Sequence, residues 1–140
     1  SRPTVMNYIA FLEQTYLIRL LPTYAKNPSV RERIPKKVFF VDTGIANINA
    51  DLSGGAQFEN TLCHQLQPYG AVTFSNRGGE IDFVLARDGH TFALEAKMTP
   101  VERHLVDLRK RAAQIEPDGY ALVGCHPSAT FDNCLWGGNL

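Results

Sequence analysis

Residues 78–97, "GGEIDFVLARDGHTFALEAK", contain the feature that most limits how this chain can fold. Asp88-Gly89 stands between two runs in which apolar and polar side chains alternate. This pattern predicts a β-hairpin with a two-residue turn. Because the turn fixes the register of the two strands, it places Asp82 directly opposite Glu95.

Alternation also separates the two faces of the predicted hairpin. The apolar face is expected to join the core and consists of Ile81, Phe83, Leu85, Phe92, Leu94 and Ala96. The other face carries the charged residues Glu80, Asp82, Glu95 and Lys97. Like charges directly opposite each other destabilise a hairpin, so the two facing acids need compensation. A cation bound between the acids would supply it, and so would a salt-bridged polar face that uses Lys97 and Arg77.

A cation bound between the two acids would have a specific chemical role. Carboxylate ligands on a rigid sheet suit Mg²⁺ or Mn²⁺, which bind one or two carboxylates together with water or substrate phosphate. Lys97 lies two residues from Glu95 on the same face, where it could orient a water or neutralise developing charge. Such a set is typical of metal-assisted phosphodiester hydrolysis.

Hydrophobic periodicity predicts the remaining elements. We expect helices over residues 4–15, 56–67 and 99–115, strands over 16–21, 38–42, 71–75 and 120–125, and a short helix or turn within 44–55. Thr99 is expected to cap its helix, with Pro100 at the first position and Glu102 completing a capping box. The order from residue 56 to 124 is helix, three strands, helix, strand, which indicates an α/β domain.

Charge and composition limit the possible partners. The chain has 140 residues, enough for one domain, and its 14 basic and 14 acidic side chains cancel. A nucleic-acid partner therefore needs a local basic patch. Two groups could contact phosphates or simply be solvated: Arg31, Arg33, Lys36 and Lys37 in a loop, and Arg103, Arg109, Lys110 and Arg111 on the later helix.

Other classes of protein receive no support from the sequence. Three cysteines without a regular spacing indicate reduced thiols and a cytoplasmic setting. The apolar runs are too short for a transmembrane helix, so no membrane association is expected. The chain contains no GxxxxGK[ST] motif and therefore no P-loop for ATP.

Several motifs in order resemble known domains. "TVMNYIAFLEQTYLIRLLPTY", "KVFFVDTGI", "FEN" and "GGEIDFVL" look like the domain of unknown function that follows the ATPase module in prokaryotic AAA-type ATPases. With Glu59 in a helix, Asp82 on one strand and Glu95-Ala96-Lys97 on the next, the chain also resembles the PD-(D/E)XK nuclease superfamily. Ile81 stands where the motif's name has proline.

The resemblance implies a restriction-endonuclease-like α-β-β-β-α-β core with a mixed central sheet flanked by helices. The implied divisions are a winged-helix-like segment over 1–53, the nuclease-like core over 54–126 and a C-terminal tail over 127–140. It also implies that the chain, which starts at Ser1, follows an ATPase module in the same polypeptide.

The same resemblance implies site residues and a function. Glu59, Asp82 and Glu95 would hold Mg²⁺ or Mn²⁺, and these three with Lys97 would be the catalytic residues of a nuclease acting on DNA or RNA. The alternative is a non-catalytic nucleic-acid-binding or regulatory module of the ATPase with the same fold; an interaction domain is a third possibility.

Overall fold

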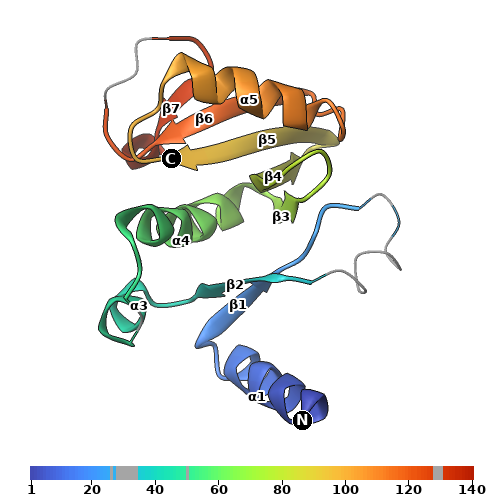
Figure 1. Ribbon diagram of the computed structural model, residues 1–140, viewed down its shortest axis with the longest axis vertical. Helices are drawn as coiled ribbons and strands as arrows, with labels where there is room; N and C mark the ends of the chain where they lie inside the picture. The colour runs from blue at the N-terminus through green and yellow to red at the C-terminus, as the bar shows by residue number, and fades with distance from the viewer. Residues whose placement is uncertain (26, 28–34, 50, 128–130) are drawn as a thin grey trace.

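The computed structural model describes residues 1–25, 27, 35–49, 51–127 and 131–140. The chain has an α/β fold in which a mixed five-stranded sheet lies between two helices. A helix and a two-stranded antiparallel ribbon precede this sheet in the chain (Figure 1). The predicted α/β class and mixed sheet are confirmed.

The five strands of the sheet lie side by side in chain order. They are β3 (Ala71–Ser75), β4 (Ile81–Arg87), β5 (His90–Lys97), β6 (Gly119–Gly124) and β7 (Cys134–Trp136). The first three strands are antiparallel neighbours, whereas β5, β6 and β7 run parallel. Since helix α5 (Glu102–Ala112) connects β5 to β6, the chain crosses over one face of the sheet at this point.

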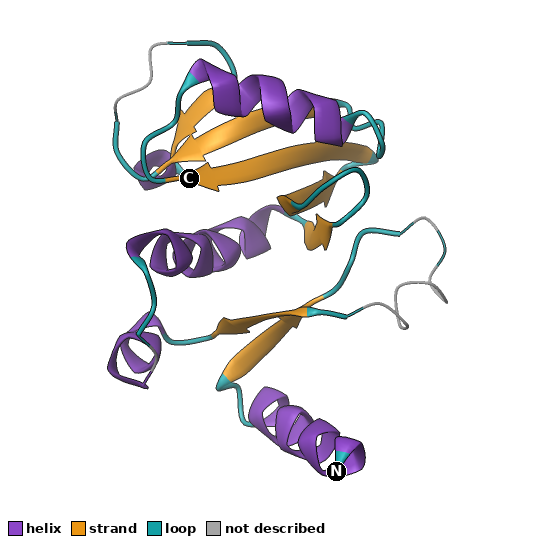
Figure 2. Ribbon diagram, in the orientation of Figure 1, coloured by secondary structure: helices purple, strands orange, loops and turns teal. Residues whose placement is uncertain are grey.

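Helices α4 (Gly54–Leu66) and α5 (Glu102–Ala112) cover opposite faces of the sheet (Figure 2). The core on the α4 side includes Leu62, Leu66, Phe74, Phe83, Leu94 and Val123. The core on the α5 side includes Ile81, Val84, Ala93, Leu108, Ala112 and Leu122. A short 3₁₀ turn, η1 (Gln67–Tyr69), extends α4 toward β3. The sheet is therefore buried on both faces, as expected where parallel strands are present.

The start of α5 differs from the prediction. Thr99 was expected to cap the helix, but the N-cap is Val101. The ring of His104 accepts a hydrogen bond from the amide of Val101 at 3.3 Å and so satisfies a free amide of the first turn. Pro100 is buried beside Gly124 of β6 instead of starting the helix.

The N-terminal part contains α1 (Arg2–Gln14), β1 (Ile18–Leu21), β2 (Lys37–Phe40) and α3 (Thr43–Asn49). Strand β1 pairs with β2 in an antiparallel ribbon. Several contacts join this ribbon and the segment after β1 to the core, and two of them involve β3 and α4 directly. Thr23 forms a parallel bridge with Phe74 of β3, and the Asn60 side chain of α4 bonds both the amide and the carbonyl of Phe40, at 2.8 and 3.0 Å. Strand β2 is thereby fixed against α4.

The predicted hairpin register is confirmed. Paired residues run from Phe83–Leu94 to Arg87–His90. Asp88 and Gly89 form the turn with positive φ angles of 51° and 82°, as a two-residue hairpin turn requires. The paired positions end at Phe83–Leu94, so the predicted pair Asp82–Glu95 directly follows the ladder but is not part of it.

The predicted face of Ile81 is wrong. Thr73 of β3 pairs with Val84, but Ser75 pairs with Ile81, so two residues of β4 oppose the single residue Phe74. This β-bulge interrupts the alternation of side chains. Ile81 therefore packs on the α5 face with Val84, whereas Phe83 packs on the α4 face.

The segment assigned to a tail contributes to the sheet. Strand β7 pairs with β6 through Leu122–Cys134, Val123–Leu135 and Gly124–Trp136. It is followed by η2 (Gly137–Asn139). A three-residue strand next to Gly-Gly has too little periodicity to be recognised from sequence.

In the part of the chain that the structure describes, no helix has the length and apolar character needed to cross a membrane.

Candidate metal centre and adjacent ion pairs

The bulge in β4 determines where the Asp82 side chain goes. Its Oδ2 accepts a hydrogen bond from the amide of Ala96 on β5 at 2.9 Å. Its Oδ1 lies 3.7 Å from the Nζ atom of Lys37 on β2. Asp82 therefore turns toward β2 and α4, and only 15% of its side chain is exposed.

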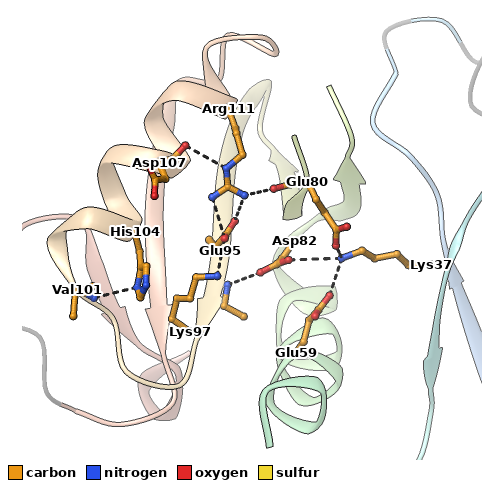
Figure 3. Close-up of polar contacts among 11 residues, drawn as sticks. Lys37, Glu59, Glu80, Asp82, Glu95, Lys97, Val101, His104, Asp107 and Arg111 are labelled. Atoms are coloured by element: carbon orange, nitrogen blue, oxygen red, sulfur yellow. Dashed lines mark hydrogen bonds and ion pairs between the residues drawn. The ribbon is translucent and has the colours of Figure 1, made fainter. Parts of the chain in front are cut away.

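Three carboxylates converge around a lysine, and we name this group the Lys37 cluster: Lys37, Glu59, Glu80 and Asp82. One oxygen of each acid lies within 4.8 Å of an oxygen of each of the others. The Nζ of Lys37 is 2.8 Å from Oε1 of Glu59 and 2.5 Å from Oε1 of Glu80 (Figure 3). By their number, type and spacing, these three carboxylates could hold a metal ion.

Local structure explains why these residues meet. Lys37 and Phe39 alternate with the exposed Val38 and so point to the inner side of β2. Phe39 packs on Phe83 with ring centroids 6.0 Å apart, which holds the strand against the core. Glu59 precedes Asn60, the residue that anchors β2, and therefore lies beside the same strand.

The cluster perturbs two ionisable groups. Burial and the neighbouring carboxylates of Glu59 and Glu95 raise the pKa of Asp82 to about 6, although the Ala96 amide and Lys37 act in the opposite direction. Burial alone would lower the pKa of Lys37, but hydrogen bonds to Glu59 and Glu80 outweigh it and raise that pKa. Lys37 is therefore charged at neutral pH, and the carboxylate charge on Asp82 is unfavourable.

A second group of charges, the Glu95 cluster, consists of Glu95, Lys97 and Arg111. The guanidinium of Arg111 on α5 donates to both carboxylate oxygens of Glu95 at 3.0 Å each. The Nζ of Lys97 is 2.8 Å from Oε1 of the same carboxylate. Only 5% of the Glu95 side chain is exposed, so two cations neutralise one buried acid.

A glycine allows Arg111 to reach this position. Gly79 has φ of 115°, and a Cβ added there would lie 2.7 Å from Cδ of Arg111. The same guanidinium also donates to the backbone carbonyl of Glu80. Arg111 thus connects the Glu95 cluster to the segment that carries Glu80.

The structure places the predicted catalytic and metal-binding residues in two groups. Glu59 and Asp82 meet in the Lys37 cluster, but their third carboxylate is Glu80. Glu95 lies outside that trio and pairs with Lys97. Glu80 was missed as a candidate ligand although the sequence contains a signal for it, since it stands two residues before Asp82 and directly follows Gly-Gly.

The residues predicted to contact phosphate fall into three groups in the structure. Arg31 and Arg33 lie outside the described residues. Four residues are exposed, namely Lys36, Arg103, Arg109 and Lys110. Lys37 and Arg111 instead form ion pairs with acids, so any phosphate contact by these two would compete with those pairs.

A cavity of about 200 Å³ lies next to the Lys37 cluster, with Lys37, Glu59 and Asn60 among its lining residues. A larger and mainly apolar cavity, of about 800 Å³, lies elsewhere on the α4 side of the sheet and is lined in part by Leu85, Phe92 and Leu94. Volume alone favours the larger cavity as a ligand site, but the charged groups gather beside the smaller one. We therefore place the candidate site at the smaller cavity, because the titratable groups with perturbed pKa values lie beside it.

The three cysteines belong to neither cluster. All three are free thiols, and burial raises the pKa of Cys63 to about 11. A thiol with such a pKa stays protonated at neutral pH and is therefore a poor nucleophile.

Comparison with known proteins gives one match. The model of a family described as Domain of unknown function (DUF8612) matches residues 1–55, which include Lys37 and the whole of the β1–β2 ribbon. No curated protein and no solved structure matches the chain.

Proposed function

We propose that this chain is a divalent-metal-dependent hydrolase of phosphodiester bonds in DNA or RNA, with a restriction-endonuclease-like core. The observation that carries the proposal is the convergence of Glu59, Glu80 and Asp82 to within 4.8 Å of one another. Lys37 supplies one positive charge to these three carboxylates, so the trio keeps an excess of negative charge that a divalent cation would offset. The adjacent Glu95-Ala96-Lys97 sequence supports the same chemistry.

Mg²⁺ or Mn²⁺ suits this site, because all three side chains offer hard oxygen ligands. When bound, such an ion polarises a phosphoryl oxygen and lowers the pKa of a coordinated water. The two clusters together contain four carboxylates and three cationic side chains, a net charge of minus one. One divalent ion would offset that negative charge and would itself attract the phosphate of a phosphodiester.

The protein residues then have distinct tasks. Asp82 and Glu59 would hold the metal together with Glu80. Lys97 is the candidate for the group that contacts the attacking water or the phosphate, because its ammonium is held 2.8 Å from Glu95 and its side chain remains one-third exposed. Glu95 is a positioning residue that fixes Lys97.

The proposal extends to the polypeptide in which this domain acts. The motifs shared with domains that follow AAA-type ATPase modules support a nuclease-like domain attached to such an ATPase. The ATPase would supply ATP-driven movement, since the described chain carries no P-loop sequence.

The second candidate is a non-catalytic nucleic-acid-binding or regulatory module. It is favoured by the ion pairs of Lys37 and Arg111, which neutralise part of the acidic charge without any metal. The exposed residues Arg103, Arg109 and Lys110 on α5 could contact phosphates in either case. Binding through them should weaken steeply as salt increases.

One experiment separates the two candidates. The chain is incubated with double-stranded DNA, single-stranded DNA and RNA, with and without Mn²⁺, and both cleavage and binding are measured. We expect Mn²⁺-dependent cleavage that Asp82→Asn and Glu59→Gln abolish. Glu13→Gln, which removes an exposed acid from α1, is the matched control and should cleave normally. Salt-sensitive binding without cleavage would favour the module, and absence of both would reject each candidate.

A further inference from the structure

The Lys37 ammonium occupies the point on which the three carboxylates converge. Its Nζ is 2.8 Å from Glu59, 2.5 Å from Glu80 and 3.7 Å from Asp82 (Figure 3). In the described part of the chain, every ion pair of these three acids runs to Lys37. The ammonium is thus the cation that the protein itself supplies to the cluster.

Lys37 cannot share this position with a divalent ion. Mg²⁺ binds carboxylate oxygens at about 2.0–2.1 Å, so an ion held by the same three oxygens would overlap the volume of the ammonium. Two cations at such a separation would also repel strongly in a site that is largely shielded from water. Only 20% of the Lys37 side chain is exposed.

The position of Lys37 depends on strand β2. The Asn60 side chain holds Phe40, three residues further along β2, through two hydrogen bonds of 2.8 and 3.0 Å. The Lys37 ammonium also lies 5.6 Å from the centre of the Phe74 ring, a cation–π contact with β3. The lysine is therefore delivered to the acids by the packing of the β1–β2 ribbon against α4 and β3.

We propose that Lys37 is a resident counter-ion that must leave the three carboxylates before a divalent cation can bind. The N-terminal ribbon that carries Lys37 thereby controls access of the metal to the site. By thermodynamic reciprocity, anything that draws Lys37 away strengthens metal binding, and bound metal weakens the hold of the acids on Lys37 by the same factor. This inference rests on the proposed metal-dependent function and adds a regulatory part to it.

Calorimetric titration with Mn²⁺ tests the proposal. Lys37→Met should bind Mn²⁺ about tenfold or more tightly than the wild type, because it removes a competing cation. Lys37→Arg keeps the charge and should bind close to the wild-type affinity. Lys36→Met removes the neighbouring exposed lysine and is the control for a general charge effect on affinity.

A second measurement uses the unaltered protein, so it does not depend on whether a variant folds. Lysines are methylated with formaldehyde and a reductant, and the rate at each position is followed by peptide mass spectrometry. Saturating Mg²⁺ should accelerate modification of Lys37, since the ammonium is released from its acids. The exposed Lys110 on α5 should react at the same rate with and without Mg²⁺.

The outcomes distinguish the two proposals. If the wild type binds Mn²⁺ but Lys37→Met binds equally or more weakly, or if Mg²⁺ binds without changing the reactivity of Lys37, this inference is overturned and the metal site stands. If neither the wild type nor Lys37→Met binds Mn²⁺ or Mg²⁺, the proposed metal-dependent function falls and this inference falls with it.

Discussion

The Lys37 cluster and the Glu95 cluster lie side by side, yet their balance of charge is opposite. In the Glu95 cluster, Arg111 and Lys97 serve one carboxylate that is 5% exposed. In the Lys37 cluster, one ammonium serves three carboxylates, and the most exposed of them, Glu80, is 57% exposed. Asp82 lies between the two and is influenced by acids of both groups (Figure 3).

This difference separates an ion pair that stabilises the fold from a site with capacity for a ligand. A buried carboxylate with two well-placed cations is fully compensated, and removing one of these cations leaves the buried charge with only part of its compensation. Three carboxylates with one cation remain under-compensated, so an additional or stronger cation stabilises them. The presence of buried acids does not distinguish the two clusters; the ratio of cations to acids does.

The largest effect is expected when the Glu95 cluster is broken. Arg111→Met should reduce the free energy of unfolding by about 3–5 kcal/mol, because Glu95 then remains buried with Lys97 alone. Arg109→Met, at an exposed position of the same helix, should change it by less than about 0.5 kcal/mol. Urea denaturation measures both values. If the double variant Glu95→Gln/Arg111→Met recovers no stability, the ion pair is not the cause.

Removing the charge of Asp82 should stabilise the protein, in contrast to breaking the Glu95 cluster, and the gain should depend on pH. The folded protein holds the proton of Asp82 up to about pH 6, whereas the unfolded chain loses it near pH 4. The contribution of this group to stability is therefore largest below pH 4 and decreases as pH rises from about 4 to 6. Asp82→Asn should remove that decrease and stabilise the protein by roughly 2–3 kcal/mol at pH 7.

Thermal or urea denaturation from pH 3.5 to 8, in the absence of divalent ions, provides the measurement for Asp82. The two proteins should have similar stability at the acid end and diverge toward neutral pH. Asp51→Asn, at an exposed site outside both clusters, is the control. An Asp82→Asn variant that is less stable than the wild type at pH 7 would show that the Lys37 pairing outweighs burial and repulsion.

Gly79 tests the connection between the clusters. A methyl group there would lie 2.7 Å from Cδ of Arg111, at a backbone φ of 115° that side chains rarely adopt. Gly79→Ala should therefore reduce stability by about 2 kcal/mol. Gly89→Ala has a similar positive φ but no atom within 4 Å of the new Cβ, so it isolates the backbone strain and should have a smaller effect. Equal losses in the two variants would mean that Arg111 is not displaced.

Much of the fold was predictable from the sequence because it depends on local signals. Asp88-Gly89 has the chemistry of a two-residue turn, and this fixed the register of β4 and β5 correctly. The order of helices and strands from α4 to β6 followed from periodicity. Strand β7 could not be recognised, since three residues carry no period and its pairing with β6 is long-range.

The candidate site was predictable only in part, for a related reason. Asp82 and Glu95 were placed correctly along the strands, but the bulge opposite Phe74 could not be anticipated from alternation. Lys37 and Arg111 come from elements distant in sequence, and their pairing with acids depends on how β2 and α5 pack. Sequence therefore indicated Glu59 and Asp82 but missed Glu80 as their partner, and it did not indicate which cation accompanies which acid.

The smallest effect on stability is expected at Lys97, where a catalytic and a structural role can be separated. Its side chain is one-third exposed, and Arg111 already holds Glu95 through two hydrogen bonds. Lys97→Met should therefore reduce the free energy of unfolding by no more than about 1 kcal/mol. If Lys97 contacts the attacking water or phosphate, the same variant should lose at least about a hundredfold in Mn²⁺-dependent cleavage, since a positioned polar group contributes that much. Its Mn²⁺ affinity should not decrease, because Lys97 is not a ligand. Cleavage that persists in Lys97→Met would mean that Lys97 is only a second counter-ion of Glu95. The Glu95 cluster would then differ from the Lys37 cluster in having a purely structural role.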